Sequence, residues 1–222
     1  MSLLEPDAVE HIPAEAASTY TKLADRYGQE YYESVADDVA NRLEPCDRLL
    51  DVGTGPGFLP LAVAERVDAA HLDAFDVTRE LVAHGRAQAV QCGIHDRVSF
   101  FIADCYTIPV VAHSYSFLTC TGVLHALDRP AQALSEFYRV LEPGGEAWVF
   151  DPVIIDVPDS PVPELTEHEQ EVFQAYGVRS DDDEPALPQT DAEPLVDASP
   201  FKTTEVRKGD QGDTRLFLTR EE

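Results

Sequence analysis

Leu-Leu-Asp-Val-Gly-Thr-Gly-Pro-Gly, residues 49–57, is the stretch that decides the fold of this chain. An apolar strand ends at the carboxylate of Asp51, and three glycines follow at alternate positions. Glycine is required where a backbone turns with positive φ or approaches a ligand closely. Residues 58–67 then predict a helix whose N-terminus faces the loop. This order predicts a ligand site at the carboxyl edge of a parallel sheet.

The glycine pattern alone leaves two other interpretations open. A tight turn between a strand and a helix can be purely structural, and a dinucleotide site places Gly-x-Gly-x-x-Gly in the same position. Here the spacing is Gly53-x-Gly55-x-Gly57, which differs from the dinucleotide pattern. The rest of the chain has to separate these alternatives.

The composition is that of an acidic globular chain. Its 222 residues suit one α/β domain, and 44% apolar residues argue against a disordered protein. Asp and Glu number 42 against 16 Lys and Arg, and the only lysines are Lys22, Lys202 and Lys208. Such a surface fits the salt-rich cytoplasm of a halophile, with an ordinary acidic protein as the alternative. The net charge of −26 argues against nucleic acid as a partner, because phosphate contacts need a basic face.

The sequence carries no signal for a membrane, for secretion or for a metal. No apolar run approaches the ~20 residues of a membrane span, and the N-terminus lacks a secretory pattern, so we expect a cytoplasmic protein. The four cysteines are scattered without a Cys-x-x-Cys pair, and we expect them to stay reduced. The seven histidines are also dispersed, so no metal site is predicted.

Strand and helix patterns alternate on both sides of the glycine loop. Apolar residues at 35, 39 and 43 predict a helix before it. After it, strands are predicted at 71–76, 97–102, 115–120 and 147–150, and helices at 79–92 and from Pro130 to the Pro143-Gly144-Gly145 turn. Thr78 is the expected N-cap of the helix at 79–92. This alternation is typical of a parallel sheet with right-handed crossovers.

The chain changes character after Asp151. Residues 152–200 are rich in proline and acidic residues, and they predict either a solvated connection or a lid over the substrate, with a helix at 166–176. Alternating patterns at 201–207 and 214–219 predict an antiparallel hairpin. A parallel sheet that finishes in such a hairpin is not typical of a dinucleotide-binding domain.

Several ordered motifs carry a family resemblance. They are Asp51 to Gly57, Phe75-Asp76-Val77-Thr78, Ala103-Asp104-Cys105 with Ile108-Pro109, Thr121 to Asp128, and Glu136-x-x-Arg139-Val140-Leu141-x-Pro143-Gly144-Gly145. From about residue 20 to residue 220, the chain resembles class I S-adenosylmethionine-dependent methyltransferases of the small-molecule type, related to those of ubiquinone and menaquinone biosynthesis.

The resemblance implies a complete domain architecture. We expect a Rossmann-like α/β fold with a seven-stranded sheet of order 3-2-1-4-5-7-6, an antiparallel C-terminal hairpin, and helices on both faces. The single domain of residues 1–222 would comprise N-terminal entrance helices (1–45), a cofactor-binding core (46–151), the insertion or lid (152–200) and the hairpin (201–222).

The resemblance also implies how S-adenosylmethionine is held. The glycine loop and Asp51 would meet the methionine portion and the sugar, and Asp76 would accept hydrogen bonds from the ribose hydroxyls. Asp104 and the backbone of Cys105 would serve the adenine. The predicted cofactor-binding residues are Asp51, Gly53, Thr54, Gly55, Gly57, Asp76, Val77, Asp104, Cys105, Thr121, Gly122 and Tyr27.

Two features of the resemblance bear on the reacting end of the site. Tyr20 and Tyr27 resemble an entrance helix in which one ring closes over the cofactor, although packing against the sheet is an equal alternative. His125 is the candidate general base, with a structural loop histidine as the alternative. The family often has a second histidine where this chain has Ala126, and its quinone C-methyltransferases tend to have Arg-Asn in this segment. A quinone substrate is therefore not favoured.

The predicted function is methyl transfer to a small-molecule acceptor by in-line displacement, which leaves S-adenosylhomocysteine as the product. Two alternatives remain open. One is a regulatory or scaffold protein that binds the cofactor without transfer, because the Pro-rich acidic region stands where a substrate cap is expected. The other is an NAD-linked oxidoreductase, which the glycine spacing and the hairpin disfavour. A homodimer is also left open.

Overall fold

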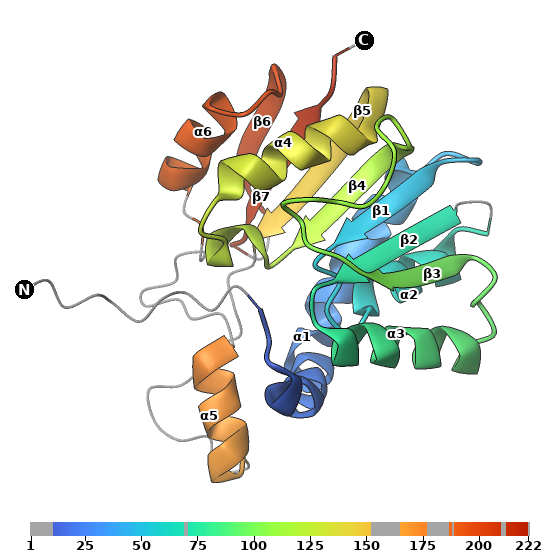
Figure 1. Ribbon diagram of the computed structural model, residues 1–222, viewed down its shortest axis with the longest axis vertical. Coiled ribbons are helices and arrows are strands. Elements are labelled where there is room, and N and C mark those ends of the chain that lie inside the picture. Colours follow the sequence, from blue (N-terminus) through green and yellow to red (C-terminus); the bar gives the residue numbers. More distant parts are fainter. Residues whose placement is uncertain are drawn as a thin grey trace, which may run out of the picture.

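In the computed structural model, which describes residues 11–68, 71–151, 165–176, 187, 189–209 and 212–221, seven strands form one sheet (Figure 1). Its order is β3-β2-β1-β4-β5-β7-β6, as predicted. The strands are β1 (Arg48–Val52), β2 (His71–Asp76), β3 (Val98–Ile102), β4 (Tyr115–Thr121), β5 (Leu141–Asp151), β6 (Thr203–Lys208) and β7 (Thr214–Thr219). The first five run parallel, and β7 pairs antiparallel with both β5 and β6.

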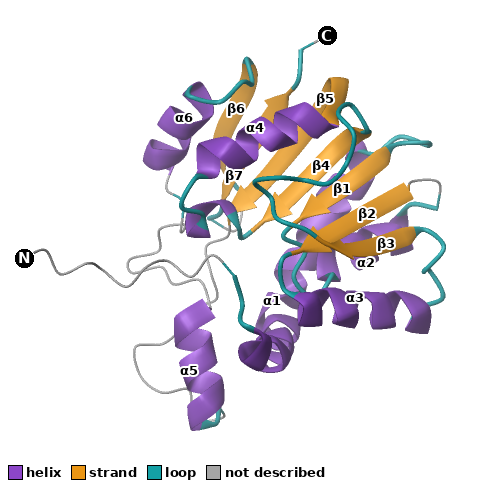
Figure 2. Cartoon of the chain, viewed as in Figure 1, coloured by secondary structure: helices purple, strands orange, loops and turns teal. Residues whose placement is uncertain are grey.

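Helices cover both faces of this sheet, as predicted (Figure 2). They are α1 (Ala14–Arg42), α2 (Phe58–Arg66), α3 (Arg79–Gln91), the short 3-10 helix η1 (Leu124–Ala126), α4 (Pro130–Val140), α5 (Glu167–Tyr176) and α6 (Gln189–Asp197). Side chains alternate along each strand, so Leu49 and Leu50 face opposite sides of the sheet. Leu49 packs in the core under α1, α2 and α3, whereas Leu50 packs in the core under α4 and α6.

The region around Pro143-Gly144-Gly145 differs from the prediction. Helix α4 ends at Val140, and Leu141 already pairs with Tyr115 of β4. The Pro-Gly-Gly segment therefore lies within the irregular start of β5, where Gly144 N–H donates to the carbonyl of Arg220 at 2.9 Å. The prediction that this turn ends the helix was wrong. The helix already ends at Val140, because the residues that follow pair with β4 and with the C-terminal end of the chain.

The structure confirms the predicted N-cap position of Thr78 but not a side-chain cap. Thr78 stands at the N-cap position of α3, but its side chain makes no capping hydrogen bond. Its Oγ1 donates instead to the carbonyl of Ile12 at 2.7 Å. Asp76 Oδ1 accepts the backbone N–H of Thr78 at 2.8 Å. The side chain is thus free to hold the N-terminal segment against the start of α3.

A single helix of 29 residues, α1, stands where several entrance helices are predicted. Its N-terminal half packs with α5 through a small apolar cluster that includes Leu23 and Phe173, and its C-terminal half joins the core over α2. Figure 1 shows α5 beside the start of α1, away from the sheet.

The predicted insertion or lid is described only in part. Helix α5 matches the helix predicted at 166–176, whereas α6, which contains Pro194, was not predicted. Residues 152–164 and 177–186 lie outside the described residues. Within the described part of the chain, no helix is long and apolar enough to cross a membrane.

Candidate cofactor site

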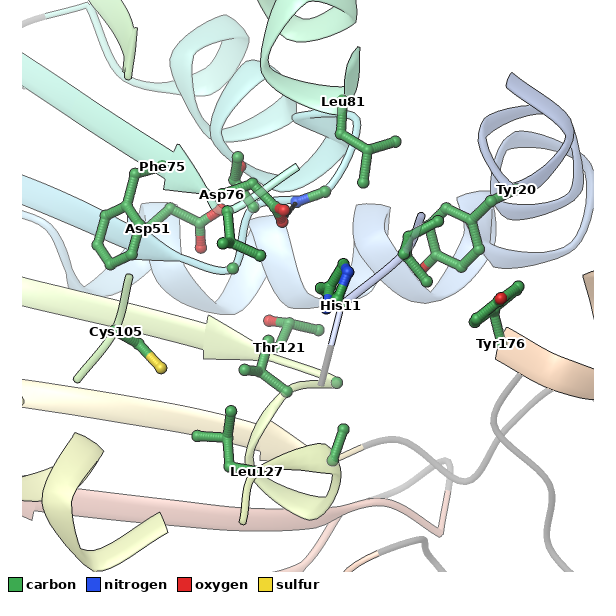
Figure 3. Close-up of a pocket in the computed structure, with 18 of the residues that line it drawn as sticks. His11, Tyr20, Asp51, Phe75, Asp76, Leu81, Cys105, Thr121, Leu127 and Tyr176 are labelled. Carbon is green, nitrogen blue, oxygen red and sulfur yellow. Dashed lines mark hydrogen bonds between the residues drawn. The ribbon is translucent and has the colours of Figure 1, made fainter. Parts of the chain in front are cut away.

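A cavity of about 510 Å³ opens at the carboxyl edge of β1, β2 and β4 (Figure 3). This volume falls in the range of small-molecule sites. The cavity brings together most of the residues predicted from the strand ends. Those that line it are Asp51, Gly53, Thr54, Gly55, Asp76, Val77, Asp104, Cys105, Thr121, Gly122 and His125.

The glycine loop forms one wall of the cavity, and two of its glycines serve different purposes. Gly55 has a φ of +55°, and a Cβ placed there would meet nothing within 4 Å, so its backbone faces open space. Gly57 has a φ of +88°, and a Cβ there would come within 2.7 Å of the ring of Phe100. Gly57 therefore permits close packing at the start of α2, and it does not line the cavity.

Asp51 is a buried carboxylate, only 2% exposed, at the end of β1. Thr119 Oγ1 donates to its Oδ1 at 2.6 Å. Burial raises the pKa of Asp51 to about 6, with the nearby charge of Asp76 contributing in the same direction. A carboxylate of this kind is most stable as an anion when a ligand supplies a positive group beside it.

Asp76 stands next to Asp51 at the end of the neighbouring strand (Figure 3). Its Oδ2 accepts the N–H of Gly55 at 2.9 Å, and its Oδ1 accepts the N–H of Thr78. Burial raises the pKa of Asp76, and these backbone donors partly offset that effect. Each oxygen of a carboxylate has a second acceptor site, so Asp76 can still accept hydrogen bonds from a pair of hydroxyl groups.

The opposite wall carries a polar group with no protein partner. Thr121 Oγ1 is buried and has no hydrogen-bond partner among the described residues, although Thr121 lines the cavity. Asp104 Oδ1 accepts the N–H of Tyr106 at 2.8 Å, which leaves its other oxygen for a ligand. A buried hydroxyl without a partner is costly. These residues therefore fit a ligand with several hydrogen-bonding groups.

Aromatic side chains close the end of the cavity farthest from the glycine loop. Tyr20 of α1 and Tyr176 of α5 lie there, with His11 beside them (Figure 3). Burial, together with the charge of Asp76, raises the pKa of Tyr20 to about 12. Tyr32 also lines the cavity and was not predicted, because only the packing of α1 on the sheet brings it there.

Tyr27 lies outside the cavity, in contrast to its predicted role. Its ring packs on Phe173 of α5 with centroids 5.3 Å apart, and its hydroxyl is buried without a partner among the described residues. Within the predicted tyrosine pair, the structure thus places Tyr20 at the cavity and Tyr27 in the apolar cluster between α1 and α5.

His125 lines the cavity from η1 and is paired with an acid that the sequence did not single out as a site residue. Its Nδ1 lies 2.9 Å from Oδ1 and 3.1 Å from Oδ2 of Asp151, the last residue of β5. The backbone N–H of His125 also donates to Asp151 Oδ2 at 3.3 Å. The side chain of Asp151 is fully buried. The signal available in the sequence was that β4 and β5 end in neighbouring positions of the predicted sheet.

Comparison with known proteins agrees with this fold. Residues 49–145 match a family described as a methyltransferase domain. The ubiquinone/menaquinone biosynthesis C-methyltransferase UbiE of Cereibacter sphaeroides is 29% identical over 107 residues, 48% of this chain and 43% of that protein. The corresponding protein of Geotalea daltonii is 32% identical over 109 residues, 48% of this chain and 46% of that protein. The chain thus matches less than half the length of these relatives.

Solved structures share the fold at low sequence identity. The protein mmp1179 of Methanococcus maripaludis, a candidate S-adenosyl-L-methionine-dependent methyltransferase, has a TM-score of 0.73 at 16% identity and covers 100% of this chain and 98% of its own. A methyltransferase of Aquifex aeolicus has a TM-score of 0.65 at 18% identity, covering 91% and 97%. Residues 49–145 thus resemble a methyltransferase domain, and the chain shares its fold with solved structures described as S-adenosyl-L-methionine-dependent methyltransferases.

Proposed function

We propose that this protein transfers a methyl group from S-adenosylmethionine to a small-molecule acceptor. The observation that carries the proposal is the cavity itself. It joins two carboxylates at neighbouring strand ends, a glycine loop with an exposed backbone, and a buried hydroxyl without a partner. The methyl group on the sulfonium is already activated, so the protein has to align the acceptor and exclude water.

The residues would divide between the parts of the cofactor. Asp76 would accept hydrogen bonds from the ribose hydroxyls, and Thr121 with Gly53 would lie beside the methionine portion. Asp51 would face the methionine ammonium, which favours its charged form despite burial. Asp104 and Cys105 would serve the adenine. This division rests on the family's arrangement and on the positions of these residues around one cavity.

The remaining part of the cavity would hold the acceptor. Tyr20, Tyr32 and Tyr176 form its walls, together with Leu127. His125 lies on the same lining and would act as the general base where the acceptor has to lose a proton. The share of aromatic rings suits a small planar acceptor better than a polymer.

Calorimetric titration with S-adenosylhomocysteine in molar KCl tests the proposal, with NADH as the control ligand. We expect micromolar binding of S-adenosylhomocysteine and no binding of NADH. Binding of NADH alone would support the oxidoreductase alternative. The absence of binding by well-folded protein would refute the cofactor assignment.

A scaffold that binds the cofactor without transfer is the remaining alternative. It would give the same titration but no transfer, so a screen with radiolabelled methyl donor and a metabolite mixture separates the two functions. We further propose a cytoplasmic location, which rests on the acidic composition. A monomer–dimer determination by light scattering at high salt would decide the oligomeric state.

A further inference from the structure

We propose that Asp151 positions His125 as the proton acceptor of the reaction, and that the methyl acceptor is an uncharged molecule that loses a proton from O–H or N–H. The inference rests on the proposed methyl transfer. It concerns a residue on β5 that the cofactor motifs do not include.

Asp151 and His125 form a close pair at the edge of the cavity. Asp151 is fully buried and contacts His125 twice, through the backbone N–H and through Nδ1 of the ring. The side chain of His125 is 18% exposed and lines the cavity. Nε2 has no hydrogen-bond partner in the part of the chain that the structure describes. One ring nitrogen is thus held by the protein, and the other is available to a ligand.

The contact with Asp151 determines which ring nitrogen of His125 carries the proton. A carboxylate accepts a hydrogen bond and so fixes the proton of a neutral imidazole on Nδ1, which leaves the lone pair on Nε2. When Nε2 takes a proton, the resulting imidazolium lies beside the negative charge of Asp151. The pair therefore directs any proton uptake to Nε2, the nitrogen that Asp151 does not hold.

Other charged groups lie around Asp151. Arg215 of β7 would be the competing cation, but its Nε donates to Asp213 at 2.7 Å and its NH1 donates to Asp38 at 2.7 Å. Among the described residues, no lysine or arginine pairs with Asp151, and His125 is its side-chain partner. The other titratable groups that interact with Asp151 are Tyr31 of α1 and Cys120 of β4, and Tyr31 in turn donates a hydrogen bond to Asp213, which precedes β7.

The charges that line the cavity indicate the charge of the methyl acceptor. Neither lysine nor arginine lines the cavity among the described residues, whereas Asp51, Asp76 and Asp104 do. Because these carboxylates are assigned to the cofactor, the acceptor would lie against Tyr20, Tyr32 and Tyr176, where no described lysine or arginine could pair with an anionic acceptor. An uncharged acceptor with a dissociable proton fits both this lining and the free Nε2.

The proton and electron balance of the step is then complete. His125 Nε2 takes the proton that the acceptor loses, and the lone pair left on the acceptor oxygen or nitrogen forms the new bond to the methyl carbon. The electron pair of the broken carbon–sulfur bond stays on sulfur. The imidazolium of His125 returns its proton to water before the next turnover.

Nitrogen-15 NMR of the imidazole rings tests the positioning role without any acceptor. We expect wild-type protein with bound S-adenosylhomocysteine to show His125 protonated at Nδ1 and unprotonated at Nε2, with His125→Gln identifying its signals among the seven histidines. In Asp151→Asn, the amide can donate to Nδ1, so the tautomer should invert. Asp68→Asn removes one exposed charge elsewhere and should leave the tautomer unchanged.

Two spectra would overturn the positioning role. One is a wild-type His125 protonated at Nε2, which decides the matter even where Asp151→Asn does not fold. The other is an unchanged tautomer in folded Asp151→Asn. Failure of wild-type protein to bind S-adenosylhomocysteine would refute the proposed function instead, while the tautomer of the free protein would still report on the pair.

Three probe acceptors test the chemical class with radiolabelled methyl donor. We expect methylation of 4-methoxyphenol or benzimidazole, and none of benzoate. In Asp151→Asn, kcat should fall by about 100-fold or more with KM nearly unchanged. Methylation of benzoate alone, or of none of the three, would overturn the proposed acceptor class.

Discussion

Replacement of Asp76 by alanine removes two acceptor oxygens from the wall of the cavity. Each oxygen already accepts one backbone N–H, from Thr78 at 2.8 Å and from Gly55 at 2.9 Å, and each has one acceptor site left for a ribose hydroxyl. In the variant, the freed N–H of Gly55 can donate to the ribose in turn. We therefore expect a net loss equivalent to one charged hydrogen bond.

A hydrogen bond to a charged group contributes about 1.5–3 kcal/mol. The dissociation constant of S-adenosylhomocysteine should accordingly rise by about 10- to 150-fold in Asp76→Ala. Calorimetric titration in molar KCl measures this change, and circular dichroism verifies that the variant is folded.

Asp73→Ala is the matched control for this experiment. Asp73 lies on the same strand and accepts a hydrogen bond from the hydroxyl of Tyr115 at 3.0 Å, but it does not line the cavity. Its replacement should lower stability and leave the affinity of folded protein within about twofold. Unchanged affinity in folded Asp76→Ala, or an equal loss in both variants, would refute the ribose assignment.

Three further measurements concern stability. Burial raises the pKa of Asp51 from 3.8 to about 6, so the unfolded chain ionises first as the pH rises and the folded state loses about 3 kcal/mol between pH 4 and 6. The difference in free energy of unfolding between Asp51→Asn and wild type should grow in favour of the variant over that range in urea titrations; a constant difference would contradict the shift. Phe137 of α4 is fully buried, and Phe137→Ala should cost about 3–5 kcal/mol in the same assay, whereas a cost under about 1 kcal/mol would contradict the packing. Because the net charge is −26, the thermal midpoint of wild-type protein should rise between 0.1 and 2 M KCl, as the Debye length falls from about 10 Å to below about 3 Å, and a falling midpoint would count against an acidic surface adapted to salt.

The strands of the sheet could be predicted because the sequence signal of each strand is local. Leu49 and Leu50 are both buried and face opposite cores, which is typical of a central strand covered by helices on both sides. The family motifs then place the strands in order. Helix α6 was missed because Pro194 lies inside it, and proline within a helix opposes the local preference that sequence patterns report.

Some residues of the candidate site could likewise be predicted from the sequence, and others could not. Asp51 and Asp76 end predicted strands, and the carboxyl ends of neighbouring parallel strands meet at one edge, so their approach could be predicted. Tyr32 and Tyr176 could not, because their positions depend on how α1 and α5 pack against each other and against the sheet. Asp151 required the adjacency of β4 and β5 together with the position of η1 after β4.

Helix α1 also determines how part of the cavity wall is attached to the sheet. At 29 residues it is about 44 Å long, and Tyr31, Asp38 and Arg42 attach it to Asp213, Arg215 and Glu146 of the far half of the sheet. Among the described residues before it, Ile12 packs against the apolar cluster of Leu23 and Phe173, and its carbonyl accepts a hydrogen bond from Thr78 Oγ1 at 2.7 Å. Tyr20 and Tyr32 line the cavity from this same helix, so the position of these two rings depends on attachments to the half of the sheet that contains β5 and β7.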